Sequence, residues 1–247
     1  DLDLVFLHNA LASNQTDGER QIDNSTFYMR LGQRIIHLLS TPTHSGIAYE
    51  IDMRLRPSGS SGMLVSTLAA FKKYQQRDAW TWEKQALVRS RVVAGDSNLA
   101  VDYARVRETV LRQSRDTQSL ANEVQQMREK IRKHLGQNTK DGKFSLKQGY
   151  GGIVDIEFMV QFTVLAWSHT HPLLSRWSDN IRILESLAQC GLFTDEESLQ
   201  LIDAYKSLRT AGHRLQLQKQ LAEVPLSAFI EQRDIVKTRW NYLMDNN

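Results

Sequence analysis

The pattern of hydrophobic and polar residues divides the chain into a short part with strand-like alternation and a longer helical part. Acidic and apolar residues alternate from Asp1 to Leu4 and apolar residues continue to Leu7, and a second alternation runs from Tyr49 to Arg56. A period of two residues is typical of a strand with one buried face. We therefore expect a first strand over residues 1–7 and a second over roughly 47–56.

One helix is predicted between these strands, after a polar loop. Asn24 or Ser25 can cap it, and apolar residues recur at helical spacing from Phe27 to Leu39. We expect it to end before Pro42, because the residue that precedes a proline is pushed out of the helical region.

From about Ser66 onward the apolar stripes keep a helical period almost without interruption. Helix starts are expected at Asp96 and at Asp116 or Thr117, and Thr194 with Glu197 has the spacing of a capping box. The last four helices are predicted over residues 153–169, 179–190, 195–219 and 228–244.

The polar run 138–143 is the expected boundary between two domains, residues 1–137 and residues 144–247. The first would contain a small mixed sheet with helices, and the second would be an α-helical bundle. The predicted fold class is α+β and mostly helical overall. Because Asp1 would already lie in a strand with no element before it, we expect the chain to be a fragment of a longer polypeptide.

Composition changes this picture little. The 247 residues carry a net charge of only +3, with basic residues scattered among acidic ones, so they do not indicate a nucleic-acid partner. No run of about 18 apolar residues occurs, so no membrane span is expected. The single cysteine, Cys190, cannot form an internal disulfide, and no secretory leader is present, so a cytoplasmic location is expected.

The two alternating segments carry the candidate chemistry. Asp1 and Asp3 would share one face of the first strand, and Asp52, Arg54 and Arg56 would share one face of the second. If the strands are neighbours, three carboxylates meet, and they repel one another unless a cation lies between them. Oxygen ligands suit Mg²⁺ or Mn²⁺, so the pattern favours metal-dependent phosphoryl or nucleotidyl transfer.

Each of these features also has an ordinary structural explanation. Acids two residues apart are most often solvated residues at a strand end. Arg54 and Arg56 could neutralise a polyphosphate or could pair with neighbouring acids. The glycine- and serine-rich turn 57–62 favours the functional interpretation, because such turns can offer backbone N–H groups to phosphate oxygens.

Two further motifs are notable. Trp80 and Trp82 are expected to pack in the core or between lobes, since large aromatic side chains dominate burial. The glycine-rich run 147–152 could present N–H groups to an anion or could simply cap the helix that follows. Asp155 lies on the apolar side of that helix, so it should be partly buried and needs a partner, such as Lys147 or an arginine.

Taken together, these motifs resemble the adenylyltransferase domain of the glutamine synthetase adenylyltransferases, a family of DNA polymerase β-like nucleotidyltransferases. The resemblance covers essentially the whole chain and rests on residues 1–6, 49–59, 79–83 and 151–158. The run 58–65 is more similar to the carboxy-terminal, adenylylating copy in that family than to the AMP-removing copy. The family's Gly-Gly or Gly-Ser element before the Asp-x-Asp strand is missing, so the nucleotidyltransferase domain is expected to lack its amino-terminal part.

The resemblance implies transfer of AMP from ATP to a tyrosine hydroxyl of glutamine synthetase, with release of pyrophosphate and control of nitrogen metabolism. It implies two divalent ions, Mg²⁺ or Mn²⁺, held by Asp1, Asp3 and Asp52, with Asp52 also a candidate to accept the hydroxyl proton. Arg54, Arg56 and Lys147 are the candidates for binding phosphate. The implied partners are glutamine synthetase and the nitrogen regulatory PII protein, with no nucleic acid and no membrane.

Two alternatives remain open. The chain could be the AMP-removing copy, which uses phosphate to release ADP from adenylylated glutamine synthetase. It could also be a regulatory module whose helical part docks a partner and whose carboxylates are vestigial.

Overall fold

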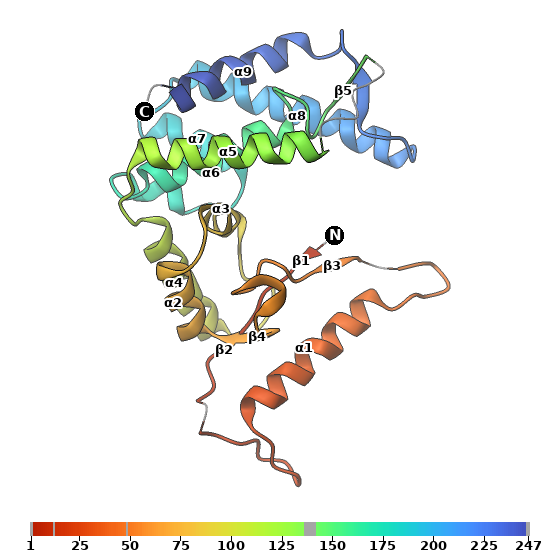
Figure 1. Ribbon diagram of the computed structural model, residues 1–247, viewed down its shortest axis with the longest axis vertical. Helices are drawn as coiled ribbons and strands as arrows, with labels where there is room; N and C mark the ends of the chain where they lie inside the picture. The colour runs from red at the N-terminus through yellow and green to blue at the C-terminus, as the bar shows by residue number, and fades with distance from the viewer. Residues whose placement is uncertain (1, 12, 48, 136–141, 246–247) are drawn as a thin grey trace. The chain divides into compact units, whose positions relative to one another are not determined.

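The computed structural model describes residues 2–11, 13–47, 49–135 and 142–245 (Figure 1). Packing divides the chain into two compact units, one formed by Asp1–Glu83 with Val92–Val110 and the other by Lys84–Arg91 with Leu111–Asn247. Helices predominate over a few short strands, which confirms the predicted mostly helical α+β class. Most of the predicted boundary run 138–143 lies outside the described residues, and the division into domains 1–137 and 144–247 stays a prediction.

The strands of the first unit pair in parallel. Strand β1 (Leu2–Asp3) lies beside β3 (Ile51–Asp52), and β2 (Phe6–His8) lies beside β4 (Val65–Thr67). The two alternating segments are therefore neighbours, which is the condition on which the sequence-based argument for a shared site depends. The predicted first strand is split into β1 and β2.

The second strand is much shorter than the predicted range 47–56. It ends at Asp52 because the backbone N–H of Arg54 donates to Asp52 Oδ1 at 2.8 Å. This is the local turn that aspartate side chains favour, and it competes with continued strand pairing.

Helix α1 (Asn24–Ser40) connects the two strand segments and ends at Thr41, close to the predicted bounds. It packs against β3 and β4. The buried Gly32 allows the close approach, since a Cβ atom there would lie 3.0 Å from Val65 Cγ2 and 3.2 Å from the Phe6 ring.

Helices α2 (Leu68–Arg77), α3 (Thr81–Arg89) and α4 (Ser97–Leu111) follow. The Thr67 hydroxyl accepts the Ala70 N–H at 3.1 Å at the start of α2. Asp96 accepts the Leu99 N–H at 2.8 Å at the start of α4, which confirms the predicted cap. Helix α3 has residues in both compact units.

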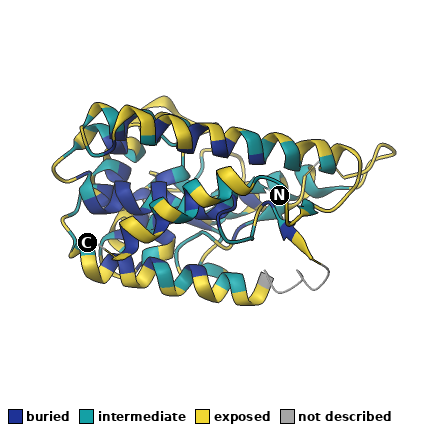
Figure 2. Cartoon of the chain, turned by 90° about the horizontal axis from the view of Figure 1, so that it is seen from above, coloured by how far each residue is buried: buried dark blue, intermediate teal, exposed yellow. Residues whose placement is uncertain are grey.

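The second unit is a helical bundle. Its helices are α5 (Thr117–Leu135), α6 (Ile153–Trp167), α7 (Asn180–Gln189), α8 (Asp195–Leu217) and α9 (Ile230–Asp245). Helix α6 packs against the other four and is buried along most of its length. Exposed residues lie on the outer helix faces and buried residues inside (Figure 2).

The predicted caps in this unit are present. Asp116 accepts the Ser119 N–H at 2.6 Å at the start of α5. The capping box at the start of α8 joins the Glu197 N–H to Thr194 Oγ1 at 3.1 Å and the Thr194 N–H to Glu197 Oε2 at 2.8 Å. The antiparallel pair β5 (Lys143–Ser145) and β6 (Glu223–Pro225) was not predicted. Within the described ranges, no helix is long and apolar enough to cross a membrane.

Candidate metal and nucleotide site

Two of the three predicted metal ligands are brought together. Asp3 of β1 is in register with Asp52 of β3, so the two side chains leave neighbouring parallel strands on the same face. The pairing is held by the Leu2 N–H, which donates to the Glu50 carbonyl at 2.8 Å, and by the Leu4 N–H, which donates to the Asp52 carbonyl at 2.9 Å. The third predicted ligand, Asp1, lies outside the described residues.

Arg54 supplies the positive charge beside these carboxylates. Its Nε donates to Asp52 Oδ2 at 2.7 Å, and its Nη2 contacts the same oxygen. The Arg54 side chain, followed by its backbone N–H, lowers the pKa of Asp52 below its usual value. Asp52 and, more weakly, Asp3 raise the pKa of Arg54. The Asp52 carboxyl is therefore held in the ionised form that a metal ligand requires.

The Arg54 side chain is 77% exposed, whereas that of Asp52 is 14% exposed. The guanidinium thus compensates the charge of the Asp52 carboxylate from the solvent side. Within the described ranges, no three His, Cys, Asp or Glu side chains form a group that could hold a metal. The chemistry of the Asp3 and Asp52 donors nevertheless suits a hard divalent cation.

Arg56 has a different environment from the one that the alternation predicts. Because β3 ends at Asp52, Arg56 does not continue the strand. Its guanidinium donates to the carbonyls of Met53 at 2.9 Å, Ser60 at 3.2 Å and Gly62 at 3.3 Å. Arg56 therefore closes the turn 57–62, and its predicted contact with phosphate stays a prediction.

The turn 57–62 is tight. Ser58 has a positive φ of 61°, and Gly59 to Ser61 form a short 3-10 turn. A Cβ atom at Gly62 would lie 1.8 Å from the Pro57 carbonyl oxygen, so only glycine fits there. The turn begins five residues after Asp52, and two of its carbonyls accept hydrogen bonds from Arg56.

The glycine-rich run 147–152 is a helix start whose N–H groups are used internally. Those of Gly149, Gly152 and Ile153 donate to the carbonyls of Ser145, Gly149 and Leu146 at 2.9, 2.9 and 3.0 Å. The Gly151 N–H donates to Asp155 Oδ2 at 2.7 Å. These contacts favour the interpretation as a helix cap. Lys147 is exposed and belongs to the second compact unit, so its predicted role in phosphate binding stays a prediction.

Asp155 has the arginine partner that its position requires. Arg128 Nε lies 2.6 Å from Asp155 Oδ1, and both side chains are fully buried. The other Arg128 nitrogens donate to Gln148 Oε1 at 3.0 Å and to the Gln148 carbonyl at 2.9 Å. Arg132 adds a contact of 3.2 Å. Asp155 is thus a structural residue that joins α5, α6 and the glycine-rich run.

Glu157 lies in a separate polar cluster. Its Oε1 accepts hydrogen bonds from Tyr205 at 3.2 Å and from Asn180 at 3.5 Å, and it pairs with Arg89 at 3.3 Å.

Cys190, at the end of α7, is half-buried, and burial raises the pKa of its thiol. A raised pKa disfavours the reactive thiolate form of this residue.

Neither tryptophan of the run 79–83 lies in the core. Trp80 is 71% exposed and Trp82 is 37% exposed, so the expected core packing is wrong, and the alternative of packing between lobes stays a prediction. The buried residue of this motif is Glu83, at 4% exposure, which accepts a hydrogen bond from Tyr74 at 2.8 Å. Sequence analysis missed Tyr74, because two residues nine positions apart on different helices leave no periodic signal.

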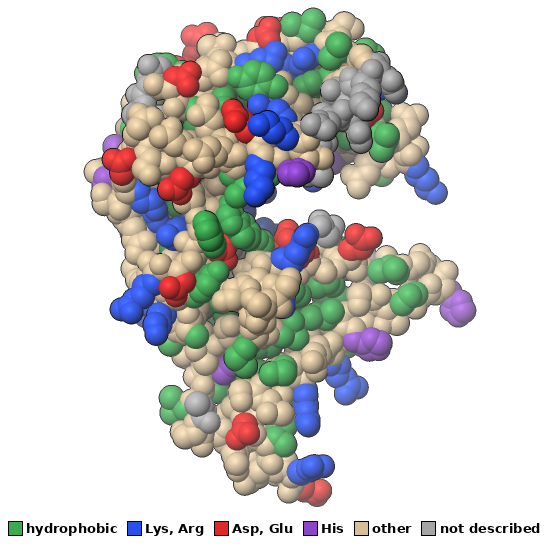
Figure 3. Space-filling view, viewed as in Figure 1, with side chains coloured by type: hydrophobic (Ala, Val, Ile, Leu, Met, Phe, Trp, Pro, Cys, Tyr) green, Lys and Arg blue, Asp and Glu red, His purple; other side chains and the backbone are tan. Residues whose placement is uncertain are grey.

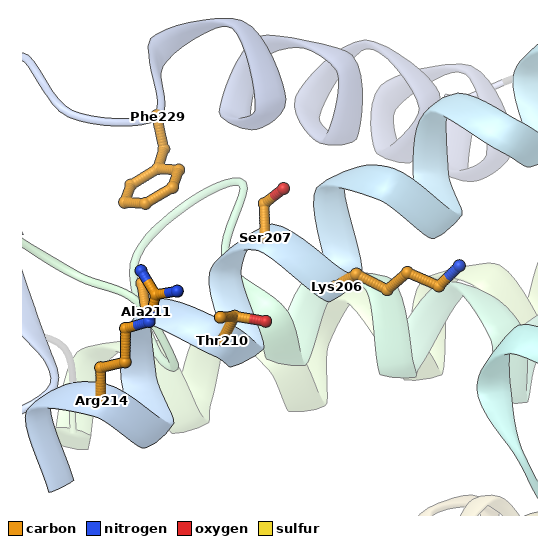
Figure 4. Close-up of a pocket in the computed structure, with 6 residues that line it drawn as sticks. All are labelled: Lys206, Ser207, Thr210, Ala211, Arg214 and Phe229. Atoms are coloured by element: carbon orange, nitrogen blue, oxygen red, sulfur yellow. The ribbon is translucent and has the colours of Figure 1, made fainter. Parts of the chain in front are cut away.

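A groove of about 320 Å³ in the second unit contains none of the predicted site residues (Figure 4). It lies along α8 and is lined by Lys206, Ser207, Thr210, Ala211, Arg214 and Phe229. On the face shown in Figure 3, acidic and basic side chains are interspersed, as they are along the sequence.

Comparison with protein families matches both parts of the chain. Residues 105–242, more than half of its length, match the family described as GlnD PII-uridylyltransferase. The chain belongs to this family. Residues 1–106, which include β1, β3 and α3, match a second family, described as glutamate-ammonia ligase adenylyltransferase.

Curated relatives carry both matches in one polypeptide. A bifunctional glutamine synthetase adenylyltransferase/adenylyl-removing enzyme of Pseudomonas putida is 50% identical over 254 residues, which cover 98% of this chain and 26% of that protein. Its counterpart in Vibrio parahaemolyticus is 50% identical over 241 residues, covering 98% of this chain and 25% of that protein. The chain thus spans about a quarter of the length of these relatives. These matches confirm the resemblance to the glutamine synthetase adenylyltransferases. The assignment to one of the family's two copies stays a prediction.

Proposed function

We propose that the site around Asp3 and Asp52 transfers AMP from ATP to a tyrosine hydroxyl of glutamine synthetase and releases pyrophosphate. The observation that carries this proposal is the parallel register of β1 and β3, which places the two carboxylates side by side on one face. The activity for which the relatives are named supports the choice of reaction and protein substrate. We assign the chain to the adenylylating copy and its first part to the polymerase β-like nucleotidyltransferases.

Asp3 and Asp52, with Asp1, would hold two divalent ions, Mg²⁺ or Mn²⁺. Bound there, the ions would neutralise phosphate oxygens and lower the pKa of the attacking phenol, which is about 10 in water. The phenol oxygen attacks the α-phosphorus of ATP, and the bond from that phosphorus to the α,β-bridging oxygen breaks as pyrophosphate leaves. We also assign Asp52 as the candidate acceptor of the proton that the phenol loses.

Arg54 is the residue most directly placed to bind phosphate. It is exposed, and it interacts electrostatically with both Asp52 and Asp3. When ATP enters, the guanidinium can exchange its carboxylate partner for phosphate oxygens, whose geometry it matches equally well. We assign further phosphate contacts to Arg56 and Lys147, glutamine synthetase and the PII protein as partners, and the cytoplasm as the location.

The test replaces Asp52 by Asn in the protein as it occurs naturally. AMP transfer is followed by the mass gain of glutamine synthetase in the presence of ATP and Mg²⁺ or Mn²⁺. We expect a loss of at least about a hundredfold, because the substitution removes a charged ligand from the metals. Asp17→Asn, in an exposed loop, is the matched control. Activity of Asp52→Asn within a few-fold of the unmodified protein would refute the assignment.

The relatives' names also include removal of AMP, so the second candidate is that this chain is the AMP-removing copy, in which phosphate attacks the AMP group and ADP leaves. Adenylylated glutamine synthetase is incubated with phosphate, and ADP is measured. ADP formation that depends on Asp52, without AMP transfer from ATP, would identify the AMP-removing copy. A vestigial site would give no metal-dependent heat when a non-hydrolysable ATP analogue and Mn²⁺ are titrated into the protein.

A further inference from the structure

The groove along α8 has a positively charged lining. Its lining residues include Lys206 and Arg214 and no acidic side chain. Both cations are exposed, and neither side chain forms a hydrogen bond or an ion pair with the residues that the structure describes. Cations that line a concave surface concentrate anions there. The groove's volume of about 320 Å³ is at the lower end of the range for small-molecule sites.

Two hydroxyls of α8 lie between these cations in the sequence and also line the groove. A serine or threonine inside a helix can bond back to the carbonyl one turn earlier, as Ser186 does to Arg182 at 2.8 Å. Ser207 and Thr210 make no such bond, and their side chains make no other hydrogen bond within the described ranges. Both hydroxyls can therefore donate to the oxygens of a bound anion.

Water alone could satisfy these polar groups, so the decisive observation is the residue on the other side of the groove. Phe229 has a positive φ of 55°, which is an outlier for a bulky side chain. Arg233 holds the segment before it, because its guanidinium donates to the carbonyls of Leu226 at 2.7 Å and Ala228 at 3.5 Å. Strained residues that their neighbours fix in this way cluster where a protein binds a ligand.

The positions of these groups favour an elongated ligand with a planar ring at one end. Phe229 faces Ala211 and Arg214 across the groove, so a ring between them would stack on the phenyl ring and on the guanidinium plane (Figure 4). Lys206 lies at the opposite end, eight residues or about 12 Å from Arg214 along the helix axis. The two hydroxyls and Lys206 thus form a region that suits phosphate, next to the place for a ring.

We propose that this groove binds a nucleoside phosphate whose base stacks between Phe229 and Arg214. Its phosphates are bound by Ser207, Thr210 and Lys206. All of these residues belong to the second compact unit, and the site uses neither the carboxylates nor a metal. The inference therefore does not depend on the proposed AMP transfer.

The test measures protection of Lys206 from chemical acetylation, which reports on the groove and requires no activity. The naturally occurring protein is acetylated with and without ATP, and each lysine is quantified by peptide mass spectrometry. EDTA is present, so that binding of ATP through divalent ions at the carboxylates does not contribute. We expect at least about fivefold slower acetylation of Lys206 at saturating ATP and no change at Lys130, an exposed lysine of α5. Equal acetylation of Lys206 with and without ATP would refute the proposal.

Variants then test the end of the groove that receives the base. Phe229→Gly removes the ring and accommodates the positive φ, and Arg214→Gln removes the guanidinium. We expect each to raise the ATP concentration for half-protection of Lys206 at least about fivefold, whereas Lys130→Gln leaves it unchanged. Similar acetylation of Lys206 without ATP in every variant shows that the fold is intact. Half-protection at the same ATP concentration in both groove variants would contradict the proposal.

Tripolyphosphate distinguishes a nucleotide from a simple anion. We expect it to protect Lys206 only at concentrations at least about tenfold above those of ATP, because it has no base to stack on Phe229. Equal protection by the two compounds, with no effect of Phe229→Gly, would mean that the groove binds phosphate alone, and the assignment to a nucleotide would be wrong.

Discussion

At the scale of single residues, the Asp52 carboxyl depends on Arg54 for its charge. The pKa of Asp52 is lowered mainly by the Arg54 side chain, so we expect Arg54→Gln to raise it toward the ordinary value of about 3.9. Carbon NMR of the side-chain carboxyl measures the shift, with Arg20→Gln in the exposed loop as the control.

The sign of the linked stability change follows from the same pKa. A carboxyl whose pKa is lower in the folded state stabilises the fold above its unfolded pKa, and this contribution is lost as the pH falls through the folded pKa. The difference in unfolding free energy between the unmodified protein and Arg54→Gln should therefore be complete above about pH 4 and shrink at lower pH. A difference that grows with acidity would contradict this account.

The buried pair of Arg128 and Asp155 gives a second prediction at this scale. Arg128→Met leaves the Asp155 carboxylate buried with much of its compensation removed, so we expect a loss of about 3–5 kcal/mol in the free energy of unfolding. The exposed pair of Arg105 and Asp102 is the control, and Arg105→Met should cost less than about 1 kcal/mol. Urea denaturation measures both, and equal effects would show that burial is not the cause.

The position of a side chain can be predicted from sequence when a local pattern determines it, and it is missed when tertiary packing determines it. Asp3 and Asp52 are predictable because alternation along a strand decides which face a side chain occupies. Arg56 does not lie on the strand face that the alternation predicts. The strand ends at Asp52, whose side chain accepts the backbone N–H of Arg54 and so begins a turn. Tyr74 and Glu83 meet only through the tertiary packing of two helices, which no local period records.

At the scale of elements, the capping box of α8 makes a quantitative prediction. Thr194→Ala removes the acceptor for the Glu197 N–H and should lower the free energy of unfolding by about 0.5–2 kcal/mol. Thr194→Ser keeps an oxygen at the same place and should cost only a small part of that. The measurement is urea denaturation of both variants, and an equal loss in both would point to the lost methyl group and not to the cap.

Helices were predicted better than strands for a physical reason. The caps of α4, α5 and α8 lie within a few residues of the backbone groups that they bind, so the local sequence contains the signal. Strands β5 and β6 pair Phe144 with Val224, and each is only three residues long. So short an element is stabilised by a partner far away in the sequence, and single-segment patterns cannot reveal it.

At the scale of the whole molecule, the division of the chain is discontinuous. The second compact unit takes residues 84–91 and everything from Leu111, so α5 packs with α6 and α9. The predicted boundary assigns α5 to the first domain. If the compact units are the folding units, the bundle that contains Asp155 needs α5, which carries Arg128, for its stability. If the predicted boundary is right, the bundle is stable without α5.

A comparison of two fragments decides between these divisions. A fragment of residues 144–247 leaves the buried Asp155 without Arg128 and Arg132 and uncovers the face of α6 that α5 covers. A fragment of residues 111–247 keeps these contacts. We expect the longer fragment to unfold cooperatively in urea and the shorter one to lose at least about 3 kcal/mol or its cooperativity, since an unpaired buried charge and exposed apolar surface both destabilise it. If the shorter fragment unfolds at the same urea concentration and with equal cooperativity, the bundle is complete from residue 144 and α5 belongs to the preceding domain.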